Sequence, residues 1–439
     1  MRKLVALITS LLIVAMISTP AHSNEPSYQV YQKTLATFTS DSTALTAQQK
    51  AQVKAAVEAN PAAEKFICTG IRYFSQPMSV NIMVRKRAKA ACEYAKELNP
   101  ALSTWFQNKP TQARSFAGKV LLTVKSVEAE ATFESYDSTR ISKRAFDNVQ
   151  KVLRANPVPS STPSIIAGPS ISAVQVELEK ARLTNSIRFW SSIYSDPYDA
   201  YLYSGKDVDW LITQLEARGN PHWNDLIRSS YWKSTGKCAQ SAANPQPGNN
   251  HFVHCIESNH ADLRYSNIFA HEFAHLPLMT KALNQPSGLF SQLPIWLNEG
   301  AAQFFSISLT DQAGDPNSRY WHELHLNGSR DTVKLSTRST PLTLVELLPT
   351  ITPQETREFF RALESESALT TSHPYSMGTW ATEVLVAIGG AEKFQDFLMT
   401  MSSTTSWESA FKTTYSLEVQ DFYGKTATYL NWIGKSFAN

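Results

Sequence analysis

The first third of the chain alternates between strand-like and helix-like spacing of apolar residues. Residues 64–74 form an apolar and β-branched run, which predicts a strand. Over residues 81–100 small apolar side chains recur at helical spacing, and this helix should end before Pro100. Residues 102–107 and 118–126 predict two further strands. The order strand, helix, strand, strand indicates a small sheet with a helix on one face.

Helical patterns dominate the rest of the chain. Residues 141–154 predict a short helix, and the Pro- and Ser-rich stretch 155–170 that follows has the composition of a linker. From residue 171 on, the composition is again that of a folded domain. There the pattern predicts an amphipathic helix, a strand and a second helix, over residues 173–194, 198–205 and 207–219.

These patterns predict an α+β protein with two domains. Residues 24–126 would form a small β-α-β-β accessory domain, and residues 127–170 a helix and a linker. Residues 171–439 would form a second, mostly helical domain.

The N-terminus has the pattern of a secretory signal peptide over residues 1–23. Basic Arg2 and Lys3 precede an apolar stretch, and small Ala21 and Ser23 stand where a signal peptidase cleaves. The alternative is an uncleaved anchor, but the apolar stretch is short for a membrane span. We therefore expect a secreted or cell-envelope protein with no transmembrane helix in the mature chain.

The four cysteines are consistent with an extracytoplasmic location. Cys68 lies close in sequence to Cys92, as does Cys238 to Cys255. Four cysteines allow three pairings, and the two local ones are the simplest. An oxidising compartment favours disulfides over free thiols, so we expect Cys68–Cys92 and Cys238–Cys255.

Charge and composition exclude few classes of function. The chain has 42% hydrophobic residues, enough for a sizeable core. Its formal charge of +3 would fall to +1 after removal of Arg2 and Lys3. This balance gives no support to a nucleic-acid partner.

The stretch HEFAH, residues 271–275, carries the candidate chemistry. Residues four apart share one helix face, so His271 and His275 can direct imidazole nitrogens at one metal ion. Glu272 is rotated away from that pair, where it can act as a base on a water activated by the metal. The motif by itself also arises by chance in some sequences that are as rich in histidine.

A third ligand is available downstream, in the stretch LPIWLNEGAAQFF. Glu299 stands there among apolar residues in a second predicted helix, which Pro294 could open. A lone buried carboxylate is costly unless it is paired or bound to a metal. A salt bridge to an arginine is the alternative, but a zinc ion is the simplest partner.

HEFAH followed by WLNEG resembles the gluzincin zinc metallopeptidases, and WLNEG is especially similar to the aminopeptidase N branch. The resemblance spans residues 171–439 and implies a mostly helical gluzincin-type domain with one Zn²⁺ per chain. Carried over, the metal ligands are His271, His275 and Glu299, and Glu272 is the general base.

Three departures qualify this resemblance. The spacer before Glu299 is longer than is usual in the aminopeptidases. The chain lacks the Gly-Ala-Met-Glu-Asn motif with which those enzymes hold a free amine, which favours an endopeptidase. Thermolysin-like members carry an Asp four residues after the Glu ligand, where this chain has Gln303.

Tyr375 is the candidate for stabilising an oxyanion. Related gluzincins often have a Tyr before a Gly and then a helix, and Tyr375-Ser-Met-Gly378 resembles that pattern. A structural hydroxyl is the alternative for Tyr375. His373 is a second, weaker candidate for the same role.

Other histidines have simpler interpretations. His251, His254 and Cys255 could form a second metal site, but a strand ending in a disulfide is the preferred interpretation. In gluzincins such a strand lines the peptide cleft, so His254 could contact substrate. The stretch HELH, residues 322–325, lacks the motif's spacing and is interpreted as a solvated helix face.

The stretch VRKRAKAACEYAKELNP, residues 84–100, resembles the signature helix of OmpA-like domains, which bind peptidoglycan. The Asp and Arg pair that grips the wall peptide in those domains is not found. Cell-wall contact through this domain is one hypothesis, and a small basic helix on an accessory domain is the other.

The function expected from these features is hydrolysis of peptide bonds in a peptide or protein substrate. Glu272 would activate the zinc-bound water. Two alternatives remain open: an inactive envelope scaffold that keeps the peptidase fold, and a zinc hydrolase of a non-peptide amide. A scaffold has no need of Glu272, which favours the enzyme.

Overall fold

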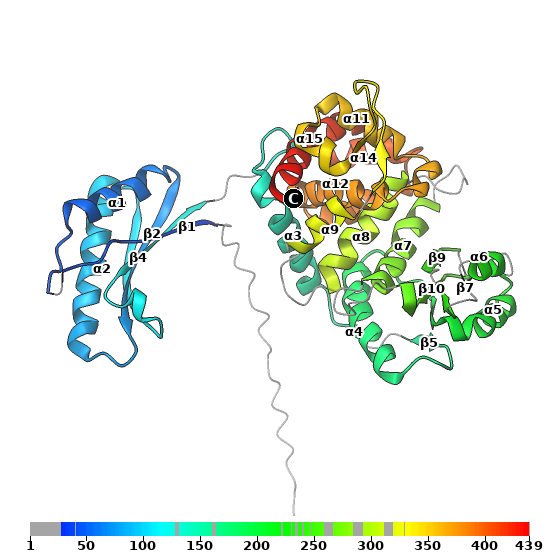
Figure 1. The fold of residues 1–439 in the computed structure, drawn as a ribbon, viewed down its shortest axis with the longest axis horizontal. Helices are drawn as coiled ribbons and strands as arrows, with labels where there is room; N and C mark the ends of the chain where they lie inside the picture. Colours follow the sequence, from blue (N-terminus) through cyan, green and yellow to red (C-terminus); the bar gives the residue numbers. More distant parts are fainter. Residues whose placement is uncertain are drawn as a thin grey trace, which may run out of the picture. The chain divides into compact units, whose positions relative to one another are not determined.

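The computed structural model describes most of the chain after the predicted signal peptide, which lies outside the described residues. Described are residues 28–39, 41–127, 131–159, 164–220, 223–229, 231–232, 236–238, 241–246, 248–258, 267–283, 293–310, 319–328 and 330–438. The chain forms two compact units that divide between Glu130 and Ala131 (Figure 1). No helix among the described residues is long and apolar enough to cross a membrane.

The first unit is a four-stranded sheet with two helices. Its elements are β1 (Tyr28–Thr34), α1 (Ala47–Glu58), β2 (Ala63–Tyr73), α2 (Met78–Leu98), β3 (Ser103–Thr111) and β4 (Val120–Val127). The strand order is β1-β4-β2-β3, with β2 parallel to β3 and antiparallel to β4. The β-α-β-β pattern is confirmed, and β1 and α1, which were not predicted, precede it.

Helix α1 was missed because few of its residues are strongly apolar. It buries Val53, Ala56 and Val57, but Gln and Lys fill most other positions. A local signal for its start is present, since Thr46 and Gln49 form a reciprocal capping box.

Both expected disulfides are confirmed, one in each unit. Cys68 on β2 is bonded to Cys92 on α2 and ties the central strand to the helix that covers it. Cys238 is bonded to Cys255 in the second unit. These two bonds involve all four cysteines of the sequence.

The second unit is mostly helical and carries one four-stranded sheet, which confirms the α+β class. The strand order is β5-β6-β10-β9, with β5 and β10 parallel to β6, and β9 antiparallel to β10. The strands are β5 (Ile165–Ala167), β6 (Asp199–Tyr203), β9 (Ser241–Asn244) and β10 (His251–Cys255), with short pairs β7 (Tyr231–Trp232), β8 (Lys237–Cys238), β11 (Thr332–Val333) and β12 (Leu342–Thr343).

The α-helices of this unit include every helix that the pattern predicts there. They are α3 (Ile141–Ala155), α4 (Ala173–Trp190), α5 (Val208–Ala217), α6 (Trp223–Ser229), α7 (Ile268–Leu283), α8 (Ile295–Thr310), α9 (Arg319–Asn327), α10 (Leu344–Leu347), α11 (Pro353–Ala362), α12 (His373–Gly389), α13 (Ala391–Met401), α14 (Trp407–Tyr415) and α15 (Val419–Phe437). Pro294 precedes α8 and accepts its first backbone hydrogen bonds, from Leu297 and Asn298.

Helix α3, placed by the sequence pattern between the domains, is part of the second unit. It packs on α12 and α8, where Gln150 donates to the Ser308 carbonyl and Asn148 to the Val386 carbonyl. Its strongly amphipathic face buries Ala145 and Val149 in the helical core. Within the predicted linker, residues 165–167 form β5 and residues 160–163 lie outside the described part.

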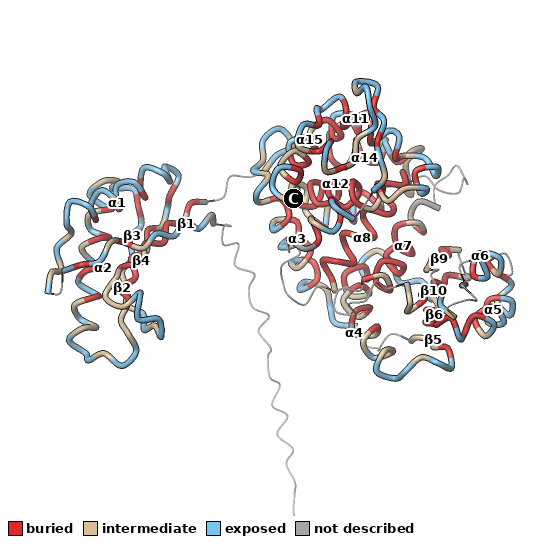
Figure 2. The backbone as a smooth tube through the Cα atoms, viewed as in Figure 1, coloured by how far each residue is buried: buried red, intermediate tan, exposed pale blue. Residues whose placement is uncertain are grey.

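A close crossing of α8 and α12 forms the centre of the helical unit. Both helices are buried along most of their length (Figure 2). A Cβ atom built on Gly378 would overlap the Trp296 carbonyl oxygen, and one built on Gly300 would overlap the Gly378 backbone. Only glycine therefore allows these two backbones to touch.

The two histidines of HELH are buried on α9, whereas Leu324 between them is exposed, so the interpretation of the whole stretch as a solvated face is wrong for His322 and His325. Trp380 Nε1 donates to His322 Nδ1 at 3.2 Å, and His322 Nε2 lies 3.1 Å from Ser142 Oγ. Ser142 Oγ donates to Glu383 Oε1 at 2.9 Å, and Tyr429 donates to Oε2 at 2.5 Å. The apolar residues at positions 321, 324 and 326 could not predict this series of hydrogen bonds, because the partners of His322 lie on α3, α12 and α15.

Gly378→Ala should destabilise the second unit by about 2 kcal/mol or more, because the added methyl group has no room at the crossing. Helix propensity by itself would make this change stabilising by about 1 kcal/mol. The sign of the change in the free energy of unfolding, measured in urea, therefore shows whether steric overlap or helix propensity dominates. A variant as stable as the wild type would show that the crossing is not tight.

Glu383→Gln should remove a pH dependence of stability. Burial raises the pKa of Glu383 from 4.5 to about 7, so the folded state holds this proton more tightly than the unfolded state. The resulting stabilisation is present below pH 4.5 and is lost as the pH rises through about 7.

Urea unfolding near pH 5 and near pH 8 tests this. Between these pH values the stability of the Gln variant relative to wild type should rise by about 1–3 kcal/mol. Glu408→Gln, at an exposed position, is the matched control and should show no such trend. A constant difference across the range would contradict the prediction.

Candidate metal centre

Helix α7 presents the two histidines of HEFAH on one buried face. His271 and His275 are both 6% exposed, and their Nε2 atoms lie 3.1 Å apart. The start of the helix is tied to α8, because Asn267 accepts from the His271 backbone and donates its side-chain amide to Ser306.

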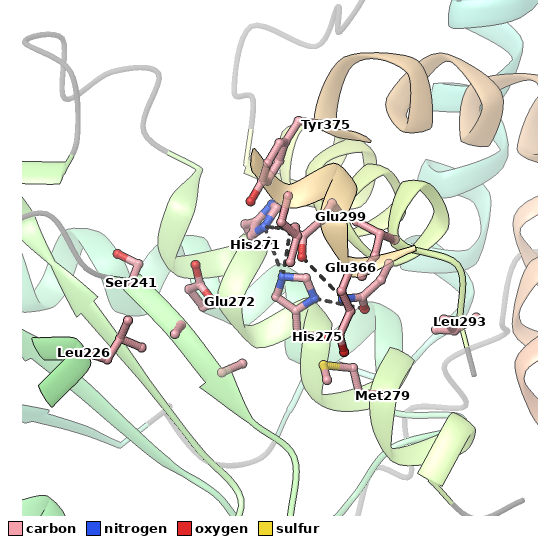
Figure 3. A pocket seen from close by; sticks show the side chains of 15 residues that line it. Leu226, Ser241, His271, Glu272, His275, Met279, Leu293, Glu299, Glu366 and Tyr375 are labelled. Atoms are coloured by element: carbon pink, nitrogen blue, oxygen red, sulfur yellow. Dashed lines mark hydrogen bonds and ion pairs between the residues drawn. The ribbon is translucent and has the colours of Figure 1, made fainter. Parts of the chain in front are cut away.

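Helix α8 brings Glu299 to the same point. Glu299 Oε2 lies 3.3 Å from His271 Nε2 and 3.5 Å from His275 Nε2. Glu299, which lies 28 and 24 positions after the two histidines in the sequence, thus completes a small triangle of three potential ligand atoms. Figure 3 shows these side chains gathered together, with Tyr375 beside His271.

The triangle has the dimensions of a zinc site. Zinc–ligand bonds of about 2.0–2.2 Å in tetrahedral geometry place neighbouring ligand atoms about 3.4 Å apart. The three observed separations of 3.1, 3.3 and 3.5 Å surround that value. Two imidazole nitrogens that face each other cannot both hold a proton there, and a cation between them removes the conflict. The donor set therefore fits the zinc ion that the resemblance implies.

A second group of potential ligands does not qualify. Cys238, Cys255 and Glu257 also lie close together, but the two sulfur atoms are bonded to each other. A disulfide has no thiolate to offer a metal. Among the described residues, His271, His275 and Glu299 are therefore the better candidate.

Asn298 holds one of the candidate ligands in place, a role that the sequence analysis missed. His275 Nδ1 lies 3.2 Å from Asn298 Oδ1, so the amide oxygen can accept the Nδ1 proton and leave Nε2 free for a metal. Its position directly before Glu299 in WLNEG was the available signal. Gln303 lies near the His271 ring, whose Nδ1 has no hydrogen-bond partner of ordinary geometry.

Glu272 lies in the same cleft but outside the three-atom triangle. It is 6% exposed, and burial raises its pKa to about 8. Although burial opposes protonation of His275, the Glu299 carboxylate raises the pKa of His275 to about 9. A divalent cation at the triangle would favour ionised Glu272 and neutral His275, which are the states required of a base and a ligand.

Tyr375, in the first turn of α12, also faces the site. Its ring lies 6.0 Å from the His271 ring and nearly parallel to it. Burial, followed by the charges of Glu299 and Glu272, raises the pKa of Tyr375, so its hydroxyl keeps its proton and remains a donor.

These groups lie in a cleft of about 630 Å³ that also contacts the edge of the sheet. Ser241, Ala242 and Ala243 of β9 line one side of the cleft. Strand β9 is an edge strand of the sheet, and its outer edge pairs with no other described strand. The rest of the lining is largely apolar and comprises Leu226, Met279, Leu293, Ile295 and Leu369, together with Asn298 and Glu366.

Three histidines considered as site residues do not line this cleft. His254 on β10 is fully buried, and its Nδ1 lies 2.8 Å from Ser241 Oγ, so β9 rather than β10 faces the cleft. His373 packs against Phe359 inside the helical unit. His251 is also fully buried and packs against Trp223.

Comparisons with known proteins add little to this description. No family model and no curated protein matches the chain. Among solved structures, the OmpA-like domain of FopA1 from Francisella tularensis subsp. tularensis SCHU S4 matches 24% of this chain and 83% of that chain. The identity is 15% and the TM-score is 0.19, and both are too low to indicate a shared fold or function.

We expect the protein to bind about one zinc ion per chain. Elemental analysis after expression in zinc-replete medium measures this. His271→Ala and Glu299→Ala should each lose most of the metal, because each removes one of three ligands. Glu366→Gln changes an exposed carboxylate in the same cleft and should keep the zinc. Full retention of zinc in a His271→Ala/Glu299→Ala double variant would contradict the site.

Proposed function

We propose that this protein is a zinc-dependent hydrolase of peptide bonds. One observation carries the proposal: three ligand atoms converge beside a buried carboxylate that lines the same cleft. His271, His275 and Glu299 would hold the metal, and Glu272 would be free to exchange protons. A purely structural zinc site has four protein ligands, whereas a catalytic site keeps one position open.

The chemistry divides between the metal and the chain. Zinc, when bound, supplies a Lewis acid that polarises a carbonyl and makes water more acidic. Glu272 accepts the proton that water loses as its oxygen attacks the carbonyl carbon, and can pass that proton to the departing amine. Asn298 keeps His275 in the tautomer that leaves Nε2 available.

Tyr375 is placed to stabilise the charge that develops during attack. The carbonyl oxygen becomes an oxyanion and gains from a hydrogen-bond donor that is already in position. The neutral Tyr375 hydroxyl lies in the cleft lining next to His271, so it can serve an oxygen bound there.

The lining of the cleft fits an extended peptide. The outer edge of β9 offers backbone donors and acceptors to a strand laid alongside it, which is a common way to bind peptides. The apolar walls favour apolar substrate side chains, and the absence of the amine-binding motif favours internal cleavage. We therefore propose an endopeptidase rather than an aminopeptidase.

The location proposed for this activity is outside the cytoplasm. The two disulfides fit an oxidising compartment, and the signal-peptide pattern over residues 1–23 agrees with export. Cell-wall contact through the first unit stays a hypothesis beside this one.

Incubation of the mature protein with a diverse peptide pool, with and without a chelator, tests the proposal. Mass spectrometry of the fragments should show internal cleavage that the chelator abolishes and added zinc restores. N-terminally acetylated peptides should be cut as readily as free ones. Removal of single N-terminal residues from free peptides only would replace the endopeptidase with an aminopeptidase. No cleavage at all would favour the inactive scaffold.

Glu272→Gln should lower turnover by a factor of about 10²–10⁴, because the amide cannot accept a proton. Zinc content and melting temperature should stay near wild type, since the two side chains have nearly the same shape. Tyr375→Phe should cost about 10²–10³ in rate if its hydroxyl serves the oxyanion. Unchanged hydrolysis by the Glu272→Gln protein would exclude Glu272 as the base.

A further inference from the structure

One end of the first unit gathers two connections of the sheet. Strands β2 and β3 run parallel and finish together, with Tyr73 paired to Thr111. Phe74 then donates its backbone N–H to the Thr111 carbonyl, and Gly118 donates to Ile71. The turn from β2 into α2 therefore lies beside the loop from β3 into β4, and we call this region the loop end.

The loop end exposes four large apolar side chains. Phe74 is 57% exposed, Met78 71%, Ile82 53% and Phe116 44%. Met78 and Ile82 lie one turn apart on α2, both exposed, and the short turn of residues 75–77 separates them from Phe74. Single exposed apolar residues are ordinary, but a group gathered at one end indicates a contact surface.

Cations surround these apolar side chains. Arg85 and Lys86 follow Ile82 on the exposed side of α2, and Arg114 and Lys119 come from the adjoining loop. The Arg114 guanidinium lies over Tyr73, and the Lys119 ammonium lies over Phe116. None of these four cations forms an ion pair with a described residue.

The surrounding sequence contains no compensating acid. Neither residues 65–92 nor residues 98–127 include an Asp or Glu. Residues 28–130 have 14 Lys and Arg against 7 Asp and Glu, a formal charge of +7. Residues 131–439 have 25 against 30, or −5, so the near-neutral total conceals a basic unit and an acidic unit.

We propose that the loop end docks on the surface of an anionic phospholipid membrane. Exposed apolar side chains that enter the interface, with cations around them that meet lipid phosphates, are the combination which such a surface binds. A soluble anionic polymer would engage the cations but leaves Met78 and Ile82 without a role. The docking is peripheral and does not depend on the proposed hydrolysis.

Co-sedimentation of the mature chain with lipid vesicles tests this. Vesicles of phosphatidylcholine mixed with phosphatidylglycerol should bind the protein, and phosphatidylcholine alone should bind it weakly. High salt should weaken the binding because it screens the phosphates. Failure to bind the mixed vesicles, or equal binding to both, overturns the proposal.

Two sets of variants separate the apolar and the cationic contributions. Phe74→Ser/Met78→Ser/Ile82→Ser should weaken binding by about tenfold or more, because less apolar surface enters the interface. Lys86→Glu/Arg114→Glu should weaken it by about twentyfold or more, since each cation near such a surface contributes about fivefold. Thermal melting should be unchanged, because all five positions are exposed.

Matched controls lie in the second unit. Val158→Ser/Val174→Ser removes apolar surface that is 67% and 79% exposed, and Lys334→Glu/Lys435→Glu reverses two exposed cations. Both control proteins should bind as the wild type does. If the loop-end variants also bind normally, the surface is not the docking site. If purified peptidoglycan captures the wild type while vesicles do not, a cell-wall polymer replaces the membrane as its partner.

Discussion

The contact between Gly300 on α8 and Gly378 on α12 is the constraint on which the second unit depends. Each glycine stands where any side chain would overlap the other helix. The residue before Gly300 is the candidate ligand Glu299, and Tyr375 lies one turn before Gly378. By letting the two backbones touch, the crossing brings a carboxylate from one helix and a phenol from the other into one cleft. A larger residue at the crossing would separate them and would disturb the site before it changed any of its groups.

Helix α12 is also held by hydrogen bonds of Trp380 and Glu383, which follow Gly378 along the helix. Glu383 accepts hydrogen bonds from Ser142 and Tyr429, and Ser142 continues through His322 to Trp380. Such a buried polar chain is stabilising only while all its members are paired, so it fixes the positions of α3, α9 and α15 around α12. The cleft has the opposite character. There the buried ionisable groups His271, His275 and Glu299 lie within 3.5 Å of one another and shift one another's pKa, and the three atoms are placed so that one cation could bind all of them.

The two units differ in charge as well as in fold, and this difference suggests a division of labour. The basic first unit carries exposed apolar residues at its loop end, whereas the acidic second unit carries the candidate centre. A peptidase held at an anionic surface would meet substrates confined near that surface. The two proposals remain independent, because one concerns lipid binding by Phe74 and its neighbours and the other concerns hydrolysis at Glu272.

Local patterns in the sequence were sufficient to predict several helices and strands, both disulfides and the candidate metal ligands. Spacing within one helix turn is enough to put His271 and His275 on one face, and the cost of a lone buried carboxylate singled out Glu299. The two disulfides, helices α2, α3, α4 and α5, and strands β2, β3, β4 and β6 also followed from short-range features. The whole-chain charge, by contrast, hid the basic character of the first unit, which becomes visible only when the chain is divided at residue 130.

Only the tertiary structure decided the rest. It shows that β9 rather than β10 borders the cleft, that Asn298 contacts His275, and that the two histidines of HELH are buried. It also shows that α3 belongs to the second unit and that Gly300 meets Gly378. Each of these features joins residues from separate elements, so no periodicity along the chain records it. The physical reason is that sequence spacing sets which face of an element is apolar, while the choice of neighbour for that face depends on how all the elements pack together.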